Sequence, residues 1–200
     1  MKKKKFSIYK FLETRPLSWS AISSFEYDPE QWYRRYILDE KEPPNKEMVF
    51  GKMIGERLAS DKNFLPQVDR HLTFEQKLEV RFGKIPMIGF MDTSHLPEKK
   101  FREFKTGKTA WTQKRVDEHG QIDMYLLMIY IAHRIKPEEM TVHLDWLKTV
   151  EHGDFTITLT EPVELYTFKT KRTMAQLLKF GAHINRIVTE MEEYANSRVV

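Results

Sequence analysis

IPMIGFMD, residues 85–92, and FREFK, residues 101–105, are the two stretches that decide the fold. Both stretches read as strands, and side chains alternate between the two faces of a strand. Glu103 and Lys105 are therefore expected on the same face of the second strand. A hairpin would bring Asp92, at the end of the first strand, beside them. The sequence predicts that two carboxylates and one ammonium group converge at this place.

Converging charges of this kind are costly to take out of water unless something compensates them. A divalent cation held by oxygen ligands does so, and it leaves the lysine close to a water that the metal activates. The pattern favours metal-dependent hydrolysis of phosphodiesters. Two plainer interpretations stay open: Asp92 begins a turn, and Lys105 forms an ordinary ion pair with Glu103. An E-x-K triplet alone is weak evidence in a chain with 31% charged residues.

Four short motifs occur in order along the chain: GKMIGE (51–56), GFMD (89–92), EFK (103–105) and QIDMY (121–125). This order resembles the PD-(D/E)XK nuclease superfamily, specifically its RecB-like exonuclease branch with the motifs GxxxH, D, ExK and QxxxY. The segment SWSAISSFEYDPEQWYRRY (18–36) is similar to the opening helix of that branch. The resemblance covers roughly residues 18–150 and implies that DNA is the substrate.

The resemblance implies a role for each residue of the central motifs. Asp92 and Glu103 would bind Mg²⁺ or Mn²⁺ through their carboxylate oxygens, and the backbone carbonyl of Phe104 would be a further ligand. Mg²⁺ prefers hard oxygen ligands in near-octahedral geometry and keeps several waters. Lys105 would orient or deprotonate the attacking water and stabilise charge on the phosphate.

Gln121 and Tyr125 are one turn apart on an expected helix, so they share a face of it. In the family, this pair orients the lysine and the DNA. Helical spacing alone would favour a tyrosine that faces the core beside an incidental glutamine. The upstream motifs favour the functional interpretation.

One position departs from the family pattern. The resemblance requires a histidine four residues after Gly51, whereas this chain has Gly55, followed by Glu56. Three explanations are open: Glu56 takes the acidic role in the metal site, another group such as His95 compensates, or the metal site is weaker than in relatives. We favour the first explanation and expect Glu56 to be a metal ligand.

Composition limits the alternatives. A chain of 200 residues with 40% apolar residues can bury a large core, so we expect one domain over residues 18–200 after a basic N-terminal extension, residues 1–17. The chain has no cysteine, which excludes disulfides, thiolate zinc sites and cysteine-ligated iron–sulfur clusters. No apolar run reaches the ~18 residues of a membrane span. We expect a cytoplasmic protein without membrane contact.

Basic residues are concentrated locally rather than spread evenly. The net charge is +4, but residues 1–10 contain five lysines and no acid. Residues 99–115 contain seven basic residues and a single acid. Such a stretch beside a metal site would bind a phosphate backbone with release of counterions, whereas alone it would be a solvated loop. Aromatic residues among basic ones could also stack on bases. The expected DNA-binding residues are Arg34, Arg35, Lys108, Trp111, Lys114 and Arg115.

Hydrophobic periodicity and turn residues predict the element order ααβββαββα. This order indicates an α/β fold with a restriction-endonuclease-like core, in which helices flank a central mixed sheet. The expected helices cover residues 18–36 (with a break near Pro29), 48–60, 112–134 and 171–197, and the expected strands cover 73–82, 85–92, 100–105, 141–150 and 154–160.

The resulting hypothesis is a small stand-alone nuclease that hydrolyses DNA with Mg²⁺ or Mn²⁺, as an exonuclease, in recombination, repair or the processing of DNA ends. Processive action would need a homo-oligomer or a recombination or helicase partner. Three alternatives stay open: a structure-specific endonuclease, a catalytically inactive DNA-binding module of the same fold, and an interaction protein whose charged strands form ordinary salt bridges.

Overall fold

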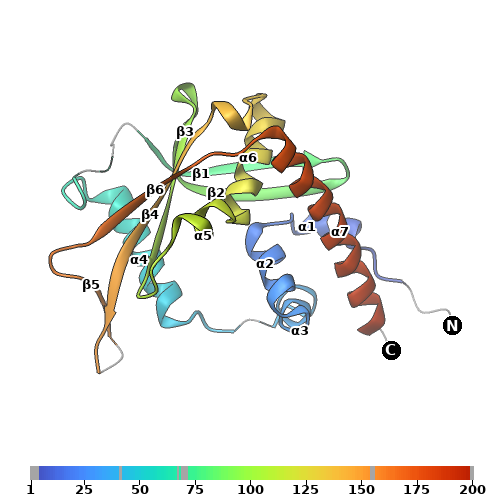
Figure 1. The fold of residues 1–200 in the computed structure, drawn as a ribbon. Helices are drawn as coiled ribbons and strands as arrows, with labels where there is room; N and C mark the ends of the chain where they lie inside the picture. The colour runs from blue at the N-terminus through green and yellow to red at the C-terminus, as the bar shows by residue number, and fades with distance from the viewer. Residues whose placement is uncertain (1–4, 41, 67, 69–71, 154–155, 199–200) are drawn as a thin grey trace.

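A central sheet contains both the stretch 85–92 and the stretch 101–105 (Figure 1). The computed structural model describes residues 5–40, 42–66, 68, 72–153 and 156–198. Within this described part the sheet has six strands, in the order β1-β2-β3-β4-β5, with β6 also paired to β4. The strands are β1 (Thr73–Phe82), β2 (Ile85–His95), β3 (Lys100–Gly107), β4 (Thr141–Glu151), β5 (Ile157–Leu159) and β6 (Leu165–Thr170).

The pairing pattern follows from the connections between strands. β1 and β2 form an antiparallel hairpin around the two-residue turn Gly83-Lys84, where Gly83 adopts a left-handed φ of 59°. β3 and β4 are parallel, which requires a crossover, and the segment that contains α5 (Gln113–Asp117) and α6 (Gly120–His133) provides it. The other pairs are antiparallel. The mixed sheet predicted from the sequence is confirmed.

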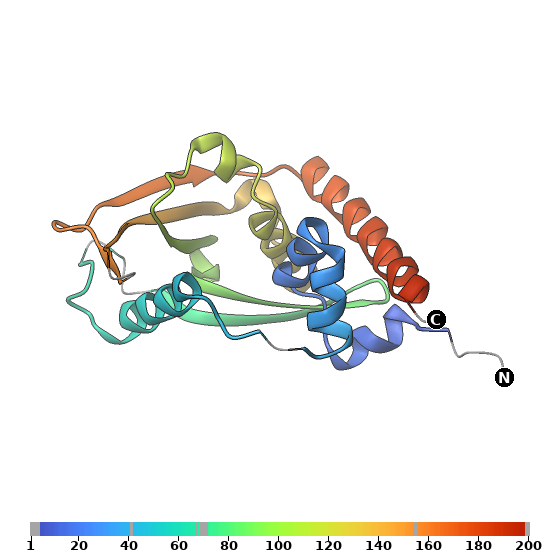
Figure 2. The same cartoon turned by 90° about the horizontal axis from the view of Figure 1, so that it is seen from below.

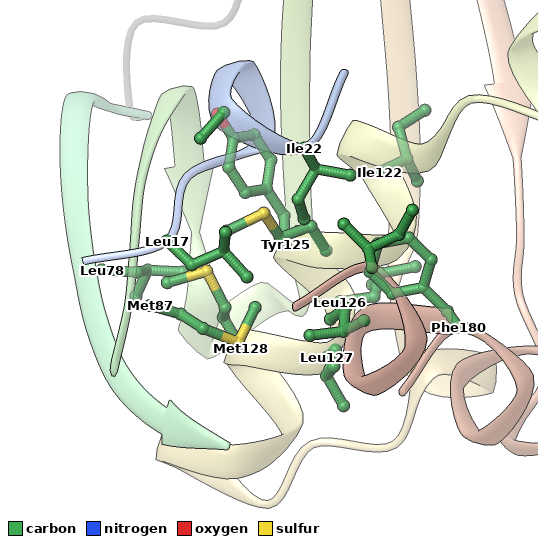
Figure 3. Packing of buried hydrophobic residues seen from close by; sticks show 14 of the residues in the cluster. Leu17, Ile22, Leu78, Met87, Ile122, Tyr125, Leu126, Leu127, Met128 and Phe180 are labelled. Atoms are coloured by element: carbon green, nitrogen blue, oxygen red, sulfur yellow. The ribbon is translucent and has the colours of Figure 1, made fainter. Parts of the chain in front are cut away.

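Helix α6 forms the centre of the main hydrophobic core. Its middle is apolar on all sides, as expected for a helix that is buried all round. In Figure 3, Met128 lies towards Met87 of β2, while Leu126 and Leu127 lie towards Phe180 of α7 (Met174–Arg198). The buried residues of α6 are Ile122, Met124, Tyr125, Leu126, Leu127, Met128 and Ile129.

Helix α4 (Lys46–Ser60) packs in a separate, smaller cluster. Phe50, Ile54 and Leu58 recur every four residues and are buried, together with Leu147 of β4. Asn45 caps the helix, because its side-chain oxygen accepts a hydrogen bond from the amide of residue 48 at 2.8 Å. Figures 1 and 2 show α4 and α7 on opposite sides of the molecule. The sheet between them positions the residues of the site.

Residues 6–17, which the sequence assigned to a basic extension over residues 1–17, pack against the rest of the domain. Helix α1 (Ile8–Thr14) buries Ile8 and Leu12, and Leu17 is also buried beside β2. The amide of Ile8 donates a hydrogen bond to Glu192 Oε1 of α7 at 3.1 Å. This helix was not predicted from the sequence because it is short, only seven residues, and follows a run of lysines. Residues 1–4 lie outside the described residues.

The predicted helix over residues 18–36 is divided, as the proline indicated. Helix α2 (Trp19–Tyr27) ends before Asp28, and α3 (Pro29–Trp32) begins directly after it. Asp28 caps α3 by accepting hydrogen bonds from the amides of residues 30 and 31 at 2.9 and 3.1 Å. A π-helical turn over residues 33–37 follows.

Three other elements differ from the prediction. The helix expected over residues 112–134 is broken between Asp117 and Gly120 into α5 and α6. Strand β6 was not predicted, because its residues alternate weakly and most are partly exposed. The strand expected over residues 154–160 is reduced to β5, and residues 154–155 lie outside the described residues. No helix in the described part is long and apolar enough to cross a membrane.

Candidate active site

The acidic and basic residues of strand β3 meet the glutamine of α6. Lys105 Nζ donates hydrogen bonds to Glu103 Oε1 at 2.9 Å and to Gln121 Oε1 at 2.7 Å. Gln121 Nε2 in turn donates to the same Glu103 oxygen at 2.6 Å. Glu103 and Lys105 therefore share one face of β3, as the period of a strand predicts. The three side chains fix one another in a closed triangle.

Tyr125 extends this network to strand β2. Gln121 Nε2 also contacts the Tyr125 hydroxyl at 2.9 Å, and that hydroxyl donates to the backbone carbonyl of Phe90 at 2.5 Å. The tyrosine ring lies against Gly89: a Cβ built there would be 2.7 Å from a ring carbon. A glycine at this position thus allows α6 to approach β2 closely. The predicted pair Gln121 and Tyr125 is brought to the carboxylate by this contact.

Asp92 stands where β2 and β3 separate. The backbone ladder between these strands extends from His95 and Lys100 to Thr93 and Arg102, and stops there. Beyond it, Asp92 Oδ2 accepts a hydrogen bond from the backbone amide of Phe104 at 2.7 Å. The carboxylate takes the place of a ladder carbonyl, so the strands can part while the amide stays paired. The opening between the strands exposes the site to a cleft.

Burial dominates the electrostatics of the two carboxylates. Desolvation raises the pKa of Asp92 and raises the pKa of Glu103 to about 7, although Lys105 opposes both shifts. The charge on Asp92 also raises the pKa of Glu103. Glu103 Oε2 is buried and has no hydrogen-bond partner among the described residues. A buried acid with an unpaired oxygen is costly, and a cation would relieve that cost.

These two acids fit a hard divalent cation. Carboxylate oxygens are the ligands that Mg²⁺ prefers, and Glu103 Oε2 has no hydrogen-bond partner among the described residues. No three histidine, aspartate or glutamate side chains of the described part stand close enough together to hold a metal ion. Further ligands would have to be other oxygens, such as a backbone carbonyl, substrate phosphate or water.

A cleft of about 500 Å³ lies over the site. Helix α4 forms one wall, with Gly51, Lys52 and Gly55 among the lining residues. The opposite wall comes from the strands and includes Asp92 and Glu103. The complete lining is Met48, Gly51, Lys52, Ile54, Gly55, Leu58, Phe74, Glu75, Asp92, Glu103, Phe104, Lys105 and Thr106.

The structure does not bring Glu56 into this cleft. Its side chain is exposed and faces Lys52, with 3.7 Å between the ammonium nitrogen and the carboxylate. Gly55, one position earlier, lines the cleft instead, and nothing lies within 4 Å of a Cβ built on it. His95 is also absent from the cleft lining, and its Nδ1 lies 3.4 Å from the carboxylate of Glu98. The placement of both residues argues against the predicted role of Glu56 as a metal ligand and against the alternative that His95 compensates.

The predicted DNA-binding residues lie outside the cleft lining. Lys108 lines a neighbouring hollow and pairs with Glu151 at 2.8 Å. The guanidinium of Arg115 lies 3.9 Å from the centre of the Trp111 ring, and Lys114 is exposed. The remaining pair is close to other side chains: Arg34 forms an ion pair with Glu40 at 2.7 Å, and Arg35 lies 5.6 Å from the centre of the Tyr36 ring.

Glu75 is a cleft residue that the sequence argument did not identify. It lies on β1, and the register of the hairpin, in which Phe74 pairs with Thr93 and Gln76 with Met91, places it across from Asp92. Its charge raises the pKa of Asp92. The two-residue turn of the hairpin fixes this register, so counting back from the turn would have found Glu75.

His119 is a second residue that sequence reasoning did not single out. It precedes α6 and contacts the rings of Trp19 and Trp111, with ring centres 6.0 and 5.0 Å apart. Burial lowers the pKa of His119 to about 4, and the nearby Lys105 charge adds to this shift. The imidazole is therefore neutral at physiological pH.

Comparison with known proteins supports the fold. No protein-family model matches the chain, and no curated protein matches its sequence. A solved structure from Eubacterium rectale that carries an exonuclease assignment aligns with a TM-score of 0.61 and 9% identity, over 100% of this chain and 88% of that one. This chain shares its fold. A phage-related exonuclease from Haemophilus somnus aligns with a TM-score of 0.54 and 12% identity, over 97% of this chain and 94% of that one.

A third solved structure agrees with these two. The alkaline exonuclease from Laribacter hongkongensis aligns with a TM-score of 0.50 and 10% identity, over 93% of each chain. At such identities the likeness establishes the arrangement of helices and strands. The fold class predicted from the sequence, a mixed sheet flanked by helices, is confirmed.

Proposed function

We propose that this protein is a deoxyribonuclease of the PD-(D/E)XK type, from the RecB-like branch, that hydrolyses phosphodiester bonds of DNA with Mg²⁺ or Mn²⁺. One observation carries the proposal: the buried oxygen Glu103 Oε2 lacks a partner in the described part of the chain, and Glu103 lines a cleft together with Asp92. The likeness in fold to three exonucleases favours exonuclease action. It does not by itself assign the chemistry.

The cation would be held by Asp92, by Glu103 and by the backbone carbonyl of Phe104. When bound, a divalent cation neutralises charge on the phosphate and lowers the pKa of water. Lys105 lies between Glu103 and Gln121, and its ammonium group would orient the attacking water and stabilise negative charge on the phosphate. Gln121 and Tyr125 act as positioning residues, because they hold Lys105 and Glu103 against the backbone of β2.

The wider setting is part of the same proposal. A nuclease of this kind would act in recombination, repair or the processing of DNA ends. Processive degradation would depend on a homo-oligomer or on a helicase or recombination partner. A cytoplasmic location agrees with these substrates.

The first experiment measures cleavage of linear DNA labelled at its 5′ or 3′ end, beside closed circular DNA, in EDTA, Mg²⁺ or Mn²⁺. We expect metal-dependent loss of linear DNA that disappears in Lys105→Ala. Cutting of circles would instead identify an endonuclease. Activity in EDTA, or full activity of the variant, would contradict the proposed chemistry.

A second candidate is an inactive DNA-binding module of the same fold. The observation that favours it is Gly55, which leaves one wall of the cleft without the side chain that the family motif calls for. This candidate predicts DNA binding without cleavage in every metal tested. The labelled-DNA experiment, with binding measured in parallel, separates the two candidates.

A further inference from the structure

Helix α4 and strand β1 both line the cleft, but only β1 contributes an acidic side chain to it. On α4, Gly55 presents no side chain, and a Cβ built there meets nothing within 4 Å. A glycine inside a helix costs about 1 kcal/mol relative to alanine, so an open position of this kind needs a reason. At Gly55, therefore, no side chain of α4 extends into the cleft towards Asp92 and Glu103.

Strand β1 offers a carboxylate to the same cleft. Glu75 lines it, and the hairpin register places Glu75 across from Asp92. Glu75 and Asp92 do not form a backbone pair, although the residues on either side of them do. Glu75 has a φ of 51°, a left-handed conformation that a non-glycine residue rarely adopts in a strand. This irregularity suits a residue held at a functional position.

The charges that line the cleft are only partly compensated. Lys105 pairs with Glu103, and Lys52 faces Glu56 outside the cleft. Neither Glu75 nor Asp92 has an ion pair with any residue in the described ranges. Independently of these two acids, Glu103 Oε2 is buried and unpaired within the described part of the chain, and Glu103 lines the same cleft. Negative charge of this amount is what a divalent cation compensates.

We infer that Glu75 completes the acidic set for the divalent cation, from β1, in place of the side chain that Gly55 lacks on α4. The inference rests on the proposed function. Since no three acidic side chains stand close enough to ligate one ion directly, Glu75 acts across the cleft through the waters that Mg²⁺ keeps around itself. The strand thus supplies an acid to the cleft wall where the family motif would supply a histidine from the helix.

The test measures Mn²⁺ binding to the whole chain without DNA, by electron paramagnetic resonance of the free ion. Glu75→Gln keeps the size of the side chain and removes its charge, and we expect it to weaken Mn²⁺ affinity at least about tenfold, as loss of an outer partner of a metal site does. Glu79→Gln is the matched control, because Glu79 is an exposed acid on the same strand that pairs with Lys77 at 2.8 Å. Its affinity should equal that of the parent.

A rescue variant strengthens the test. Gly55→His adds a nitrogen ligand on α4, where the structure leaves room for a side chain. Combined with Glu75→Gln, it should restore Mn²⁺ affinity. Glu75→Asn is a second single variant, because asparagine tolerates a left-handed conformation, and it should lose affinity while the protein keeps its melting temperature.

The outcomes separate this inference from the proposed function. If the parent binds no Mn²⁺, or if Asp92→Asn binds it as well as the parent, the metal site itself is refuted. If the parent binds and Asp92→Asn does not, but Glu75→Gln and Glu75→Asn bind like the parent, the role of Glu75 alone is overturned. An equal loss in Glu79→Gln would also overturn it, since general charge would then explain the effect.

Discussion

Glu103 is the residue in which stability and function conflict most directly. It is buried, and one oxygen accepts hydrogen bonds from Lys105 and Gln121 while the other has no partner among the described residues. Burial favours the neutral acid and raises its pKa to about 7. The folded chain thus accepts a destabilising group at the position where a cation would bind.

Glu103→Gln should remove a pH-dependent loss of stability. The pKa of Glu103 is raised from 4.5 to about 7, so the folded state favours the protonated form. The stability that this form gives is fully present below about pH 4.5 and is lost as pH rises through about 7, with a total on the order of 3 kcal/mol. In EDTA, the variant should therefore be more stable than the parent at pH 8 and similar to it near pH 4.5. Urea unfolding across this range checks it, and parallel pH profiles would contradict it.

Spacing in the sequence identified residues that lie together in the folded site, because side chains return to the same face every two residues in a strand and every three to four in a helix. Glu103 with Lys105, and Gln121 with Tyr125, needed no knowledge of the tertiary structure. Glu56 lies outside the cleft because successive residues of a helix are separated by about 100°, so the residue next to Gly55 faces another direction. Which side chains of α4 face the cleft depends on how the helix is rotated about its axis relative to the sheet, and only the structure shows that rotation.

At the scale of elements, the close approach of α6 to β2 determines the site. Gly89 makes this approach possible, whereas Gly55 on α4 faces open space. The two glycines look equivalent in the sequence, since each belongs to a short motif. In the structure, Gly89 is needed for a close contact between α6 and β2, whereas Gly55 is not needed for any contact among the described residues.

Gly89→Ala should destabilise the protein and disturb the site. Its Cβ would lie 2.7 Å from a ring carbon of Tyr125, so the ring must shift away from the Phe90 carbonyl. Overpacking of this kind costs about 1–3 kcal/mol, and nuclease activity should fall with it. Gly55→Ala is the matched variant and should gain about 0.5–1 kcal/mol, because it removes helix-interior flexibility without a clash. Thermal unfolding of both variants checks the prediction, and equal melting temperatures would refute it.

Helix α1 should contribute measurably to stability. Leu12 is 3% exposed in the main core, so Leu12→Ala should cost about 2–5 kcal/mol. Lys10→Ala changes an exposed side chain of the same helix and should have little effect. Chemical denaturation of the two variants distinguishes a packed helix from a dispensable extension. Similar stabilities would favour the extension.

Long elements with a clear period were predictable, and short or interrupted ones were not. The hairpin β1–β2 and helix α4 agree with the sequence pattern within a few residues. The break before α6 was not predicted, because no proline stands between Asp117 and Gly120 to mark it. β6 depends on pairing with β4, which the local sequence does not encode.

For the whole molecule, folding redistributes the charge that the sequence concentrates in residues 99–115. Five of the seven basic residues in this stretch form ion pairs, and their partners include acids distant in sequence, which explains why the pattern alone overestimated the free positive charge. The pairs are Lys99–Glu139, Lys100–Glu98, Arg102–Asp145, Lys105–Glu103 and Lys108–Glu151. Lys114 and Arg115 have no ion pair with a residue of the described part.

These two unpaired residues should therefore contribute more to DNA binding than the paired ones. We expect the double variant Lys114→Ala/Arg115→Ala to weaken DNA binding and to reduce the slope of log affinity against log salt by about 2, since each phosphate contact contributes about 0.9. Lys99→Ala, whose ammonium already pairs with Glu139, should change the slope by much less. Fluorescence anisotropy in EDTA, which prevents cleavage, measures both variants across a salt series. Equal slopes for the double variant and the parent would show that DNA does not contact this part of the surface.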